Sequence, residues 1–520
     1  MQIRDYLSES FFYGMNDRCP TQLLPSGYCH LIENALVYQQ KLFKRAGTTA
    51  VAAQIGTLDQ DILGLATFQP VPGTNYIVAC INGAANSLLY YWTGTGNFAT
   101  LGAETFTVDL PMNFVQAVGS LFGFNGTEVV DISAALAVTK NRAGVPLGKF
   151  GCYFHNYLFV AGVAAYPNRL YWSDINTPTT FTAANVVDIN PGDGDEITGL
   201  ATFNDELYVF KRNTIWSVSG WAGSTFSSTT VGYQNTNSKL YGIGTPSHKS
   251  IVATGKDLFW ISYMGGIPHF RCLTQTAWAT SLEQGIVSFD IETTMDGLHS
   301  DSLDLTTGIF DGKYVRWAVP NGSSTYNNLV LVFEPTVKAS TNLGVWRSWV
   351  KWTGLNPSAF INSQISGEQA IYYGSGDDVG LVYKMDASVY TDNGTAVPLK
   401  VQTRDFRLDV ARKAKWVYLF SNVKTGSGGS LNVYGRIQQY EDFTLQNTLS
   451  LVGSSPGLGP TGTFTLGVST LGGTSVQMFR TILKHLTGHT LQLEFDETGP
   501  YSCELHDYRV YGVPKGLRAD

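Results

Sequence analysis

A polar turn followed by a short apolar, aromatic-rich segment recurs along this chain and restricts its possible folds more than any other feature. The copies centre on seven positions that lie 37 to 57 residues apart, Tyr76, Leu121, Leu158, Leu207, Leu258, Tyr314 and Ile371. A propeller blade of four antiparallel strands needs about 40–50 residues and buries its faces only against its neighbours. The spacing therefore predicts an all-β chain with a β-propeller of about six to eight blades. A string of unrelated β-hairpins is the alternative.

The composition agrees with short strands rather than helices. Only 14% of the 520 residues are charged, 13% are aromatic and 55 are glycine. Glycine supplies the positive φ of tight turns, and aromatic side chains suit pleated surfaces. A chain of this length exceeds what one hydrophobic core usually holds, so we expect more than one unit. The low charge also favours a surface that is partly covered by other subunits.

The texture of the sequence divides the chain into three parts. Residues 1–50 are expected to form an N-terminal arm with a short helix-compatible stretch at His30 to Val37, which packs on its own propeller or on a neighbouring subunit. Residues 51–390 carry the propeller repeat. Residues 391–520 are expected to form an antiparallel β-sandwich or jelly roll. Its predicted strands are Lys400–Leu408, Lys415–Phe420, Leu431–Tyr434, Thr463–Val468, Gln477–Leu483, Thr490–Phe495 and Glu504–Val513.

The charge balance and the N-terminus limit the partners and the compartment. A net charge of −7 argues against a protein whose main task is to grip phosphates, although DNA can pass such a surface without adhering. The first residues contain no apolar core of a signal peptide, and the uncharged stretch Tyr157 to Pro167 is too short to span a bilayer. We therefore expect synthesis in the cytosol and no membrane span. The Asn-Gly-Ser/Thr triplets at Asn125, Asn321 and Asn393 are then turns rather than glycosylation sites.

The six cysteines give no metal-binding pattern. Their separations are long apart from that between Cys19 and Cys29, and no CxxC pair occurs. We expect reduced thiols, with a disulfide framework as the minority alternative. The other cysteines are Cys80, Cys152, Cys272 and Cys503.

Two clusters contain residue types that bind metal ions. Asp193, Asp195 and Glu196 lie in one acidic loop and could offer oxygen ligands to calcium, but the spacing of an EF-hand is missing. A turn in which the carboxylates cap backbone N–H groups is the preferred interpretation. His485 and His489 flank a predicted hairpin turn, so adjacent strand ends are preferred over a metal site there. No cofactor is expected.

No motif marks a catalytic site. The sequence lacks a nucleophile elbow, a Walker loop, a dinucleotide fingerprint and an HExxH helix. Seven tryptophans could form sugar-stacking platforms, but their place in strands favours core packing. They are Trp172, Trp216, Trp260, Trp317, Trp346, Trp349 and Trp352. The residues alone therefore predict a non-catalytic β scaffold.

Several phrases resemble the nozzle or tubular tail proteins (tubular protein B-like) of short-tailed bacteriophages and related head-to-tail connector and tail-hub proteins. The phrases are Phe12 to Arg18, Leu24-Pro25, Lys44 to Thr48, Arg169 to Asp174, Pro178 to Phe181, the acidic loop through Gly199-Leu200, and Val345 to Trp349. The sequence departs from the family pattern at Tyr13, where glycine is common, and at Ala46, where proline is common.

The resemblance implies a structural virion protein of the phage tail, made in the host cytoplasm. It would form a ring, typically of six copies, below the portal and adaptor proteins. The ring would retain and conduct the double-stranded DNA during ejection and anchor tail fibre or tail-tip proteins. Arg18, Lys41, Lys44 and Arg45 of the arm are candidates for binding a neighbour's acidic surface, and an exposed basic turn with no partner is the alternative.

Two other functions remain open at the level of the sequence. One is a carbohydrate-binding or carbohydrate-cleaving propeller for host-surface recognition. The other is a bacterial propeller that serves as a platform for protein interactions.

Overall fold

The computed structural model divides the chain into two compact units. It describes residues 5–11, 13–53, 55, 60–219, 226–231, 233–235, 238–239, 241–277, 283, 285–335, 348–377, 379–409, 412–424, 428–438, 441–452 and 476–515. The propeller unit comprises Ala50–Val330 and Leu355–Met385. The terminal unit comprises Met1–Thr49, Leu331–Gly354 and Asp386–Asp520.

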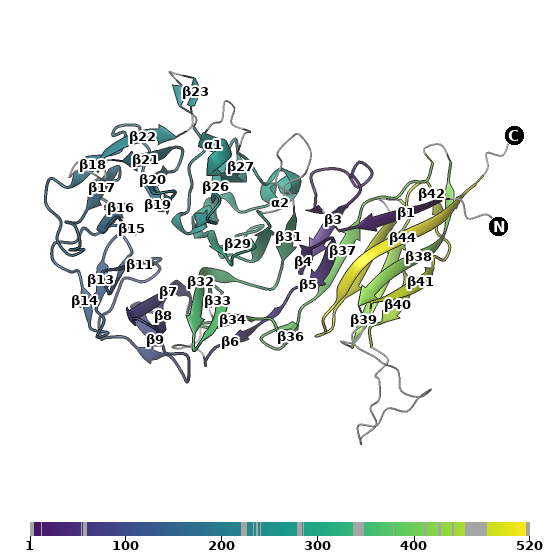
Figure 1. Cartoon of the computed structure of the whole chain (residues 1–520), viewed down its shortest axis with the longest axis horizontal. Coiled ribbons are helices and arrows are strands. Elements are labelled where there is room, and N and C mark those ends of the chain that lie inside the picture. The colour runs from purple at the N-terminus through teal and green to yellow at the C-terminus, as the bar shows by residue number, and fades with distance from the viewer. Residues whose placement is uncertain are drawn as a thin grey trace. The chain divides into compact units, whose positions relative to one another are not determined.

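The propeller unit is built from radial antiparallel sheets (Figure 1). Four of them have four strands each and follow one another along the chain. Their strands are β7 (Ile62–Val71), β8 (Thr74–Ile81), β9 (Leu88–Trp92) and β10 (Ala99–Thr100); β11 (Asn113–Ala117), β12 (Ser120–Phe124), β13 (Val129–Ile132) and β14 (Val138–Lys140); β15 (Phe150–Phe154), β16 (Tyr157–Ala161), β17 (Arg169–Trp172) and β18 (Val186–Asp188); and β19 (Ile197–Phe203), β20 (Glu206–Lys211), β21 (Ile215–Ser219) and β22 (Ser227–Val231).

Shorter sheets complete the ring. They contain β25 (Val252–Ala253), β26 (Leu258–Met264) and β27 (Ile267–Cys272); β28 (Thr307–Phe310) and β29 (Val315–Val319); and β32 (Pro357–Ile365), β33 (Glu368–Ser375) and β34 (Val382–Asp386). The strand β30 (Leu329–Phe333) carries the chain from one unit to the other. A small hairpin of β23 (Tyr233–Asn235) and β24 (Ser238–Lys239) stands apart from these sheets.

The ring closes through its inner strands. β7 contacts β11 on one side and β32 on the other, and β15 lies between β11 and β19. The 3₁₀ helix η1 (His248–Ser250) contacts both β19 and β28, and β28 contacts β32. The predicted β-propeller is therefore confirmed, and its sheets fall within the predicted range of about six to eight.

Helix is confined to short pieces. Beside η1, these are α1 (Leu273–Ala277), α2 (Glu292–Asp296), η2 (Phe289–Ile291) and η3 (Ser300–Leu305). No helix in the described part of the chain is both long enough and apolar enough to cross a membrane.

Two-residue turns between neighbouring strands account for the polar residues that precede each apolar segment of the sequence repeat. Several hairpins between the first and second strands of a sheet have positive φ at both turn residues, which is the type I′ geometry that matches strand twist. Asparagine, aspartate and glycine tolerate this conformation best. Examples are Val118 and Gly119 (46° and 79°), His155 and Asn156 (47° and 66°), and Asn204 and Asp205 (48° and 63°).

The repeat's aromatic residues fill the cores between the sheets. Trp260 and Trp317 are fully buried, and Trp172, Trp216, Trp349 and Trp352 are at most 7% exposed. Each indole N–H of Trp260 and Trp317 donates to a backbone carbonyl, of Ile243 at 2.7 Å and of Ser250 at 2.9 Å. The prediction that the tryptophans pack in the core is confirmed for these six; Trp346 lies outside the described residues.

The terminal unit contains two larger sheets. The first sheet has the order β4 (Ala35–Tyr38), β5 (Lys41–Lys44), β44 (Glu504–Pro514), β38 (Ala414–Lys424) and β41 (Val476–Ile482), with β1 (Asp5–Ser10) on β44 and β42 (Thr487–Gly488) on β38. The second sheet joins β31 (Trp349–Trp352), β2 (Gly14–Met15), β3 (Tyr28–Glu33), β37 (Leu399–Thr403), β43 (Gln492–Glu497), β39 (Ser430–Arg436) and β40 (Thr444–Ser450). Shorter pairings join β6 (Gly47–Ala50), β35 (Thr391–Asp392) and β36 (Thr395–Ala396).

Aromatic rings join the two sheets. The ring centroid of Tyr508 on β44 lies 5.5 Å from that of Phe495 on β43, 5.9 Å from that of Phe406 and 5.6 Å from that of Phe11. All four side chains are at most 1% exposed. The N-terminal residue Phe11 thus belongs to the same core as strands near the C-terminus.

The predicted three-part division differs from the observed one. The N-terminal segment is no separate arm, because its strands pair with those of the C-terminal part. The stretch His30 to Val37 is not helical but lies in β3 and β4, where partners on other strands satisfy its backbone. The segment Leu331–Gly354, expected in the propeller, belongs to the terminal unit. The predicted strand Thr463–Val468 lies outside the described residues, and β40 was not predicted.

Candidate functional site

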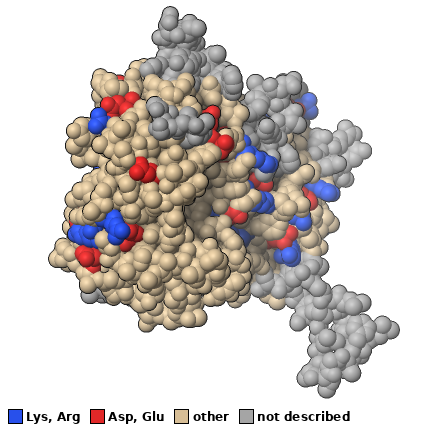
Figure 2. Space-filling model, turned by 60° about the vertical axis from the view of Figure 1, so that its left-hand side comes forward, with Lys and Arg blue, Asp and Glu red and all other residues tan. Residues whose placement is uncertain are grey.

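Residues with charged side chains make up only 14% of this chain. On the face shown in Figure 2, several lysine and arginine residues lie beside aspartate or glutamate, and wide neutral areas separate the charged residues. Such mixed groups indicate local ion pairing rather than a surface of one sign.

The acidic loop is occupied by a lysine. The Lys211 ammonium is fully buried and donates to both carboxylate oxygens of Asp193, at 2.7 and 2.9 Å. Asn190 also donates to Asp193, at 2.8 Å. Asp195 accepts the backbone N–H groups of Arg212 and Asn213 at 3.1 and 2.9 Å. The loop therefore caps the turn between β20 and β21.

The electrostatics of this loop fit the capping role. Burial raises the pKa of Asp193, but the hydrogen bonds from Lys211, Asp195 and Asn190 outweigh burial and lower it below its usual value. Burial raises the pKa of Asp195. Glu196 is exposed. Among the residues that the structure describes, no group of three His, Cys, Asp or Glu side chains could hold a metal ion. These contacts favour the capping turn over the weak calcium hypothesis for Asp193, Asp195 and Glu196, because the Lys211 ammonium already neutralises Asp193.

Two of the four basic candidates are buried rather than offered to a partner. The Lys44 ammonium is fully buried and pairs with Glu497, and it also donates to the carbonyl of Gly499 at 2.5 Å. The Arg45 guanidinium is fully buried and bonds Asp392 through two nitrogens, at 2.5 and 2.9 Å. The expectation that Lys44 and Arg45 clasp a neighbouring subunit is therefore corrected: both charges are neutralised within the terminal unit.

The other two basic candidates stay near the surface. Lys41 lies 3.7 Å from the carboxylate of Glu504 and its side chain is 37% exposed. Arg18 is exposed. For these two residues the contact with a neighbouring subunit stays a prediction.

Further polar contacts hold Arg45 in place. Its Nε donates to the Asn34 side chain at 2.9 Å, and Nη2 donates to the Thr353 carbonyl at 3.0 Å. Its guanidinium lies 5.6 Å from the Trp352 ring. Arg45 thus connects residues from all three segments of the terminal unit. Within the motif Lys44 to Thr48, this residue has a structural role.

The phrase Arg169 to Asp174 is structural as well. Arg169 forms two hydrogen bonds to Asp188, at 2.7 and 3.0 Å, between β17 and β18. The Asp174 carboxylate accepts hydrogen bonds from Thr182 and Asn185, at 2.9 and 2.8 Å. These residues fix the loop that contains Pro178 to Phe181. Of the last phrase, residues 345–347 lie outside the described part, and Trp349 is buried.

The remaining sequence candidates offer no chemistry. All six cysteines are described and none forms a disulfide, as predicted; burial raises the pKa of Cys80, Cys152 and Cys503 to about 12. His485 is exposed at a turn with φ 60° and is separated from His489 by β42.

A site that the sequence did not indicate lies on the axis of the propeller unit. This axial cavity has a volume of about 350 Å³. The wall contains residues at the start of the inner strand of several sheets. The inner strands therefore begin at the same end of the axis. These wall residues include Ile62, Leu63, Asn113, Phe150, Ile197 and Ser358.

Polar bonds keep the wall rigid. Asn327 donates to the backbone carbonyls of Leu305 and Pro357, both at 2.8 Å. Thr198 donates to the carbonyl of Thr245 at 2.6 Å. The wall is thus pre-formed, as in most ligand-binding cavities.

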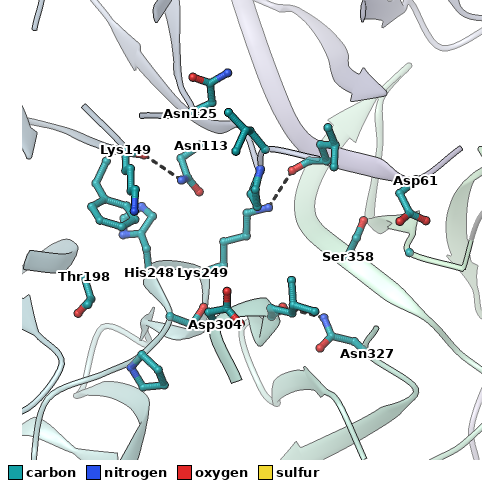
Figure 3. A pocket seen from close by; sticks show the side chains of 18 of the residues that line it. Asp61, Asn113, Asn125, Lys149, Thr198, His248, Lys249, Asp304, Asn327 and Ser358 are labelled. Carbon is teal, nitrogen blue, oxygen red and sulfur yellow. Dashed lines mark hydrogen bonds between the residues drawn. The ribbon is translucent and has the colours of Figure 1, made fainter. Parts of the chain in front are cut away.

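Lys249 extends through the middle of the axial cavity (Figure 3). Its Nζ donates to the Leu63 carbonyl at 3.0 Å, from η1 to β7 on another side of the ring. Burial lowers the pKa of Lys249 to about 8, against a smaller opposing effect of Cys80. Burial likewise lowers the pKa of the adjacent His248 to about 4, so its ring is neutral at pH 7.

The charges around the axial cavity come from both signs. Lys149 and Arg212 join Lys249 on the cationic side. Asp61, Glu196 and Asp304 are the carboxylates of the wall. Their positions at the starts of strands and in separate turns explain why no sequence motif joins them.

Comparisons with known proteins bear on the fold only. No protein-family model matches this sequence, and neither does any curated protein. Similar solved structures include the WD40 domain of Neurospora crassa Pan2, at 8% identity and a TM-score of 0.38, with 67% of this chain and 97% of that one covered.

Two other solved structures are similar to the same degree. One is an inactive virginiamycin B lyase from Staphylococcus aureus with quinupristin (10% identity, TM-score 0.39, 64% of this chain and 96% of that one). Another is the extracellular domain of the putative one component system BT4673 from B. thetaiotaomicron (10%, 0.39, 77% and 48%). Likeness at this level carries no argument about ligand or activity. The structure itself shows an all-β chain with a β-propeller.

Proposed function

We propose that this chain is a structural protein of the tail of a short-tailed bacteriophage, a nozzle or tubular tail component that assembles as a ring, typically of six copies. In that role it retains the genome, conducts double-stranded DNA during ejection, and contacts portal or adaptor proteins and tail fibres. The resemblance of the phrases given above suggests the family. One structural observation supports an assembling scaffold most directly, and it lies on the terminal unit.

That observation is an exposed apolar area on the first sheet, here called the outer patch. On the edge strand β41, Val476 is 48% exposed, Met478 63% and Ile482 55%. Tyr418 pairs with both Ile482 and Tyr511 across the sheet, so their side chains share one face with those of β41. An exposed apolar patch on an edge strand normally marks an interface, since it otherwise invites aggregation.

Aromatic residues extend the outer patch across β38 and β44. The ring of Phe420 lies 5.2 Å from that of Tyr511 and 6.4 Å from that of Tyr418. Arg480 stacks on Tyr418 at 4.1 Å. Tyrosine, methionine and arginine are the residues that interfaces favour. A second copy of the chain is the occupant that a ring requires, and the neutral surface in Figure 2 fits a protein with large subunit contacts.

The overall charge is compatible with a DNA conduit. The net charge of −7 gives little attraction to phosphates, so DNA could slide past without being held. This argument concerns the whole chain and assigns no residue to a lumen.

Negative-stain imaging and light scattering of the purified chain test the proposal. We expect particles with rotational symmetry and a central pore, and a molar mass several times that of one chain. The double variant Met478→Asp/Ile482→Asp should shift the population to monomers, because it places charges in the contact. Ile175→Asp, at an isolated residue that is 54% exposed, is the matched control and should leave the rings intact. A wild type that stays monomeric at high concentration contradicts the proposal.

A host-surface carbohydrate receptor is the second candidate. The tryptophans described by the structure are buried and offer no stacking platform, which weakens that candidate. Binding or cleavage on a panel of bacterial polysaccharides would favour it over the ring.

A further inference from the structure

The axial cavity of the propeller unit contains a cation without a counter-ion. Lys249 is half-buried, and its ammonium makes one hydrogen bond, to the Leu63 carbonyl, within the described part of the chain. An ammonium has three donors, so two make no hydrogen bond to a described residue. No described carboxylate lies within salt-bridge distance of it. A desolvated charge in this state is unfavourable unless a partner neutralises it.

Other cations face the same space. Lys149 and Arg212 line the cavity and form no salt bridge with any described residue. Figure 3 places Lys149 and His248 together on one side, with Lys249 between them and Ser358. Both Lys149 and Arg212 are exposed, so they can attract an anion to the entrance while Lys249 meets it inside.

The carboxylates of the wall do not neutralise this group. Glu196 and Asp304 are exposed and form no ion pair among the described residues, so water solvates them. Asp61 is half-buried on the side near Ser358. Because these three carboxylates repel negative charge, the cavity favours a small anion that reaches Lys249 over a large polyanion.

We propose that the axial cavity is a binding site for a small oxyanion, a carboxylate, sulfate or phosphate group, free or carried by a small molecule. The Lys249 ammonium is its main contact, and Lys149 and Arg212 supply attraction from the entrance. The volume of about 350 Å³ is near the lower end of ligand sites, which run from about 300 to 1,000 Å³. The site does not depend on the proposed tail role.

Protonation gives the site a pH dependence of known sign. The anion binds the charged form of Lys249, so affinity is present below pH 8 and falls as the pH rises above it, where the ammonium loses its proton. The groups that face Lys249 are His248, neutral at these pH values, with Asp61, Glu196, Asp304, Lys149 and Arg212 around it. Sulfate is the best probe because its own charge is constant in this range.

Isothermal titration of the full chain tests the proposal with sulfate, acetate and inorganic phosphate, with glucose as a neutral ligand. We expect millimolar or tighter binding of at least one anion and none of glucose. Lys249→Met should weaken that binding by about 10-fold or more, the usual effect of losing a hydrogen bond to a charged group. Lys249→Arg should retain binding. Lys256→Met, at an exposed lysine in a hairpin turn, should leave it unchanged.

A second measurement on the wild type covers the case in which Lys249→Met fails to fold. Sulfate should slow the acetylation of Lys249, followed by mass spectrometry, and leave the rate at Lys256 unchanged. No anion binding, equal affinity in folded Lys249→Met, or equal sulfate effects on both lysines would overturn the proposal. Binding of acetate but not of phosphate or sulfate identifies a carboxylate ligand, and the reverse identifies a phosphate or sulfate ester; either supports the site.

Discussion

Arg45 and Asp392 lie 347 residues apart in the chain, yet they form a two-pronged ion pair in which the guanidinium is fully buried. The planar geometry of both groups makes this the strongest kind of side-chain hydrogen bonding. The Arg45 side chain is fully buried and that of Asp392 is 17% exposed, and the pair connects the segment between β5 and β6 to β35.

Removal of Arg45 should therefore destabilise the terminal unit. We expect Arg45→Met to lower the free energy of unfolding by about 3 kcal/mol, because Asp392 then keeps its charge without a counter-ion and with only the Thr48 hydroxyl as a side-chain donor among the described residues. Urea unfolding measures the change. Arg142→Met is the control: Arg142 is 45% exposed and lies 3.8 Å from Asp131, a surface pair worth less than about 1 kcal/mol. Equal losses in both variants would contradict the assignment.

Ala at position 47 should also be destabilising. A Cβ on Gly47 would lie 2.1 Å from the carbonyl oxygen of Thr391, so the backbone must move. We expect Gly47→Ala to cost about 1–3 kcal/mol, in the range of overpacked cores. Gly297→Ala, whose nearest contact is 3.4 Å, should be close to neutral in the same urea titration.

Calcium binding by the acidic loop can be tested on the wild-type protein. The wild-type melting temperature should not respond to added calcium, since Lys211 already occupies the carboxylates. Lys211→Met should lower the free energy of unfolding by about 3 kcal/mol through the unpaired Asp193. A calcium-dependent rise in the wild type would restore the ion-binding hypothesis.

Two histidines with lowered pKa values predict lower stability in acid. The pKa of His269 is lowered to about 4, first by burial and then by Arg271, from an ordinary 6.5. The unfolded chain therefore takes up the proton first as the pH falls. The stability is present above pH 6.5 and is lost between about 6.5 and 4, with His248 acting in the same sense. His269→Gln should flatten the urea midpoint against pH, and exposed His485→Gln should not.

The buried tryptophans can be tested one at a time. Trp260→Phe removes the hydrogen bond to the Ile243 carbonyl and leaves that oxygen buried. We expect a loss of about 1–3 kcal/mol, read by chemical unfolding of the propeller unit. Tyr263→Phe, at a residue 39% exposed, should change the stability by less than about 0.5 kcal/mol.

Local sequence predicted the propeller because its signals are local. Each of the seven repeat positions lies in the second strand of a hairpin or, for Tyr314, just before it. The turn residues before them, such as Asn204 and Asp205, adopt the left-handed geometry that their side chains tolerate. At these turns the residue types themselves favour the observed backbone conformation, so no contact with a distant part of the chain is needed to explain it.

The terminal unit and the sites depend on distant partners, so the sequence could not reveal them. Lys44 looked exposed because charged residues usually are, and only Glu497, 453 residues away, explains its burial. The stretch at His30 had a helix-compatible pattern, but pairing with β37 overrides it. The axial cavity draws residues such as Lys149, Lys249 and Asp304 from the position just before β15, from η1 and from η3. A buried lysine has no local signature.

The pairing of β1 with β44 has a consequence for biosynthesis. Asp5 is opposite Gly512, so β1 cannot pair with β44 until the residues between them have been made. At about 5–20 residues per second, the ribosome needs about 25–100 s to complete that distance. During this time the nascent chain can finish the ring of sheets while its leading end stays unpaired. The yield of native protein would then depend on how well β1 is protected, by a chaperone or by early contact with another polypeptide.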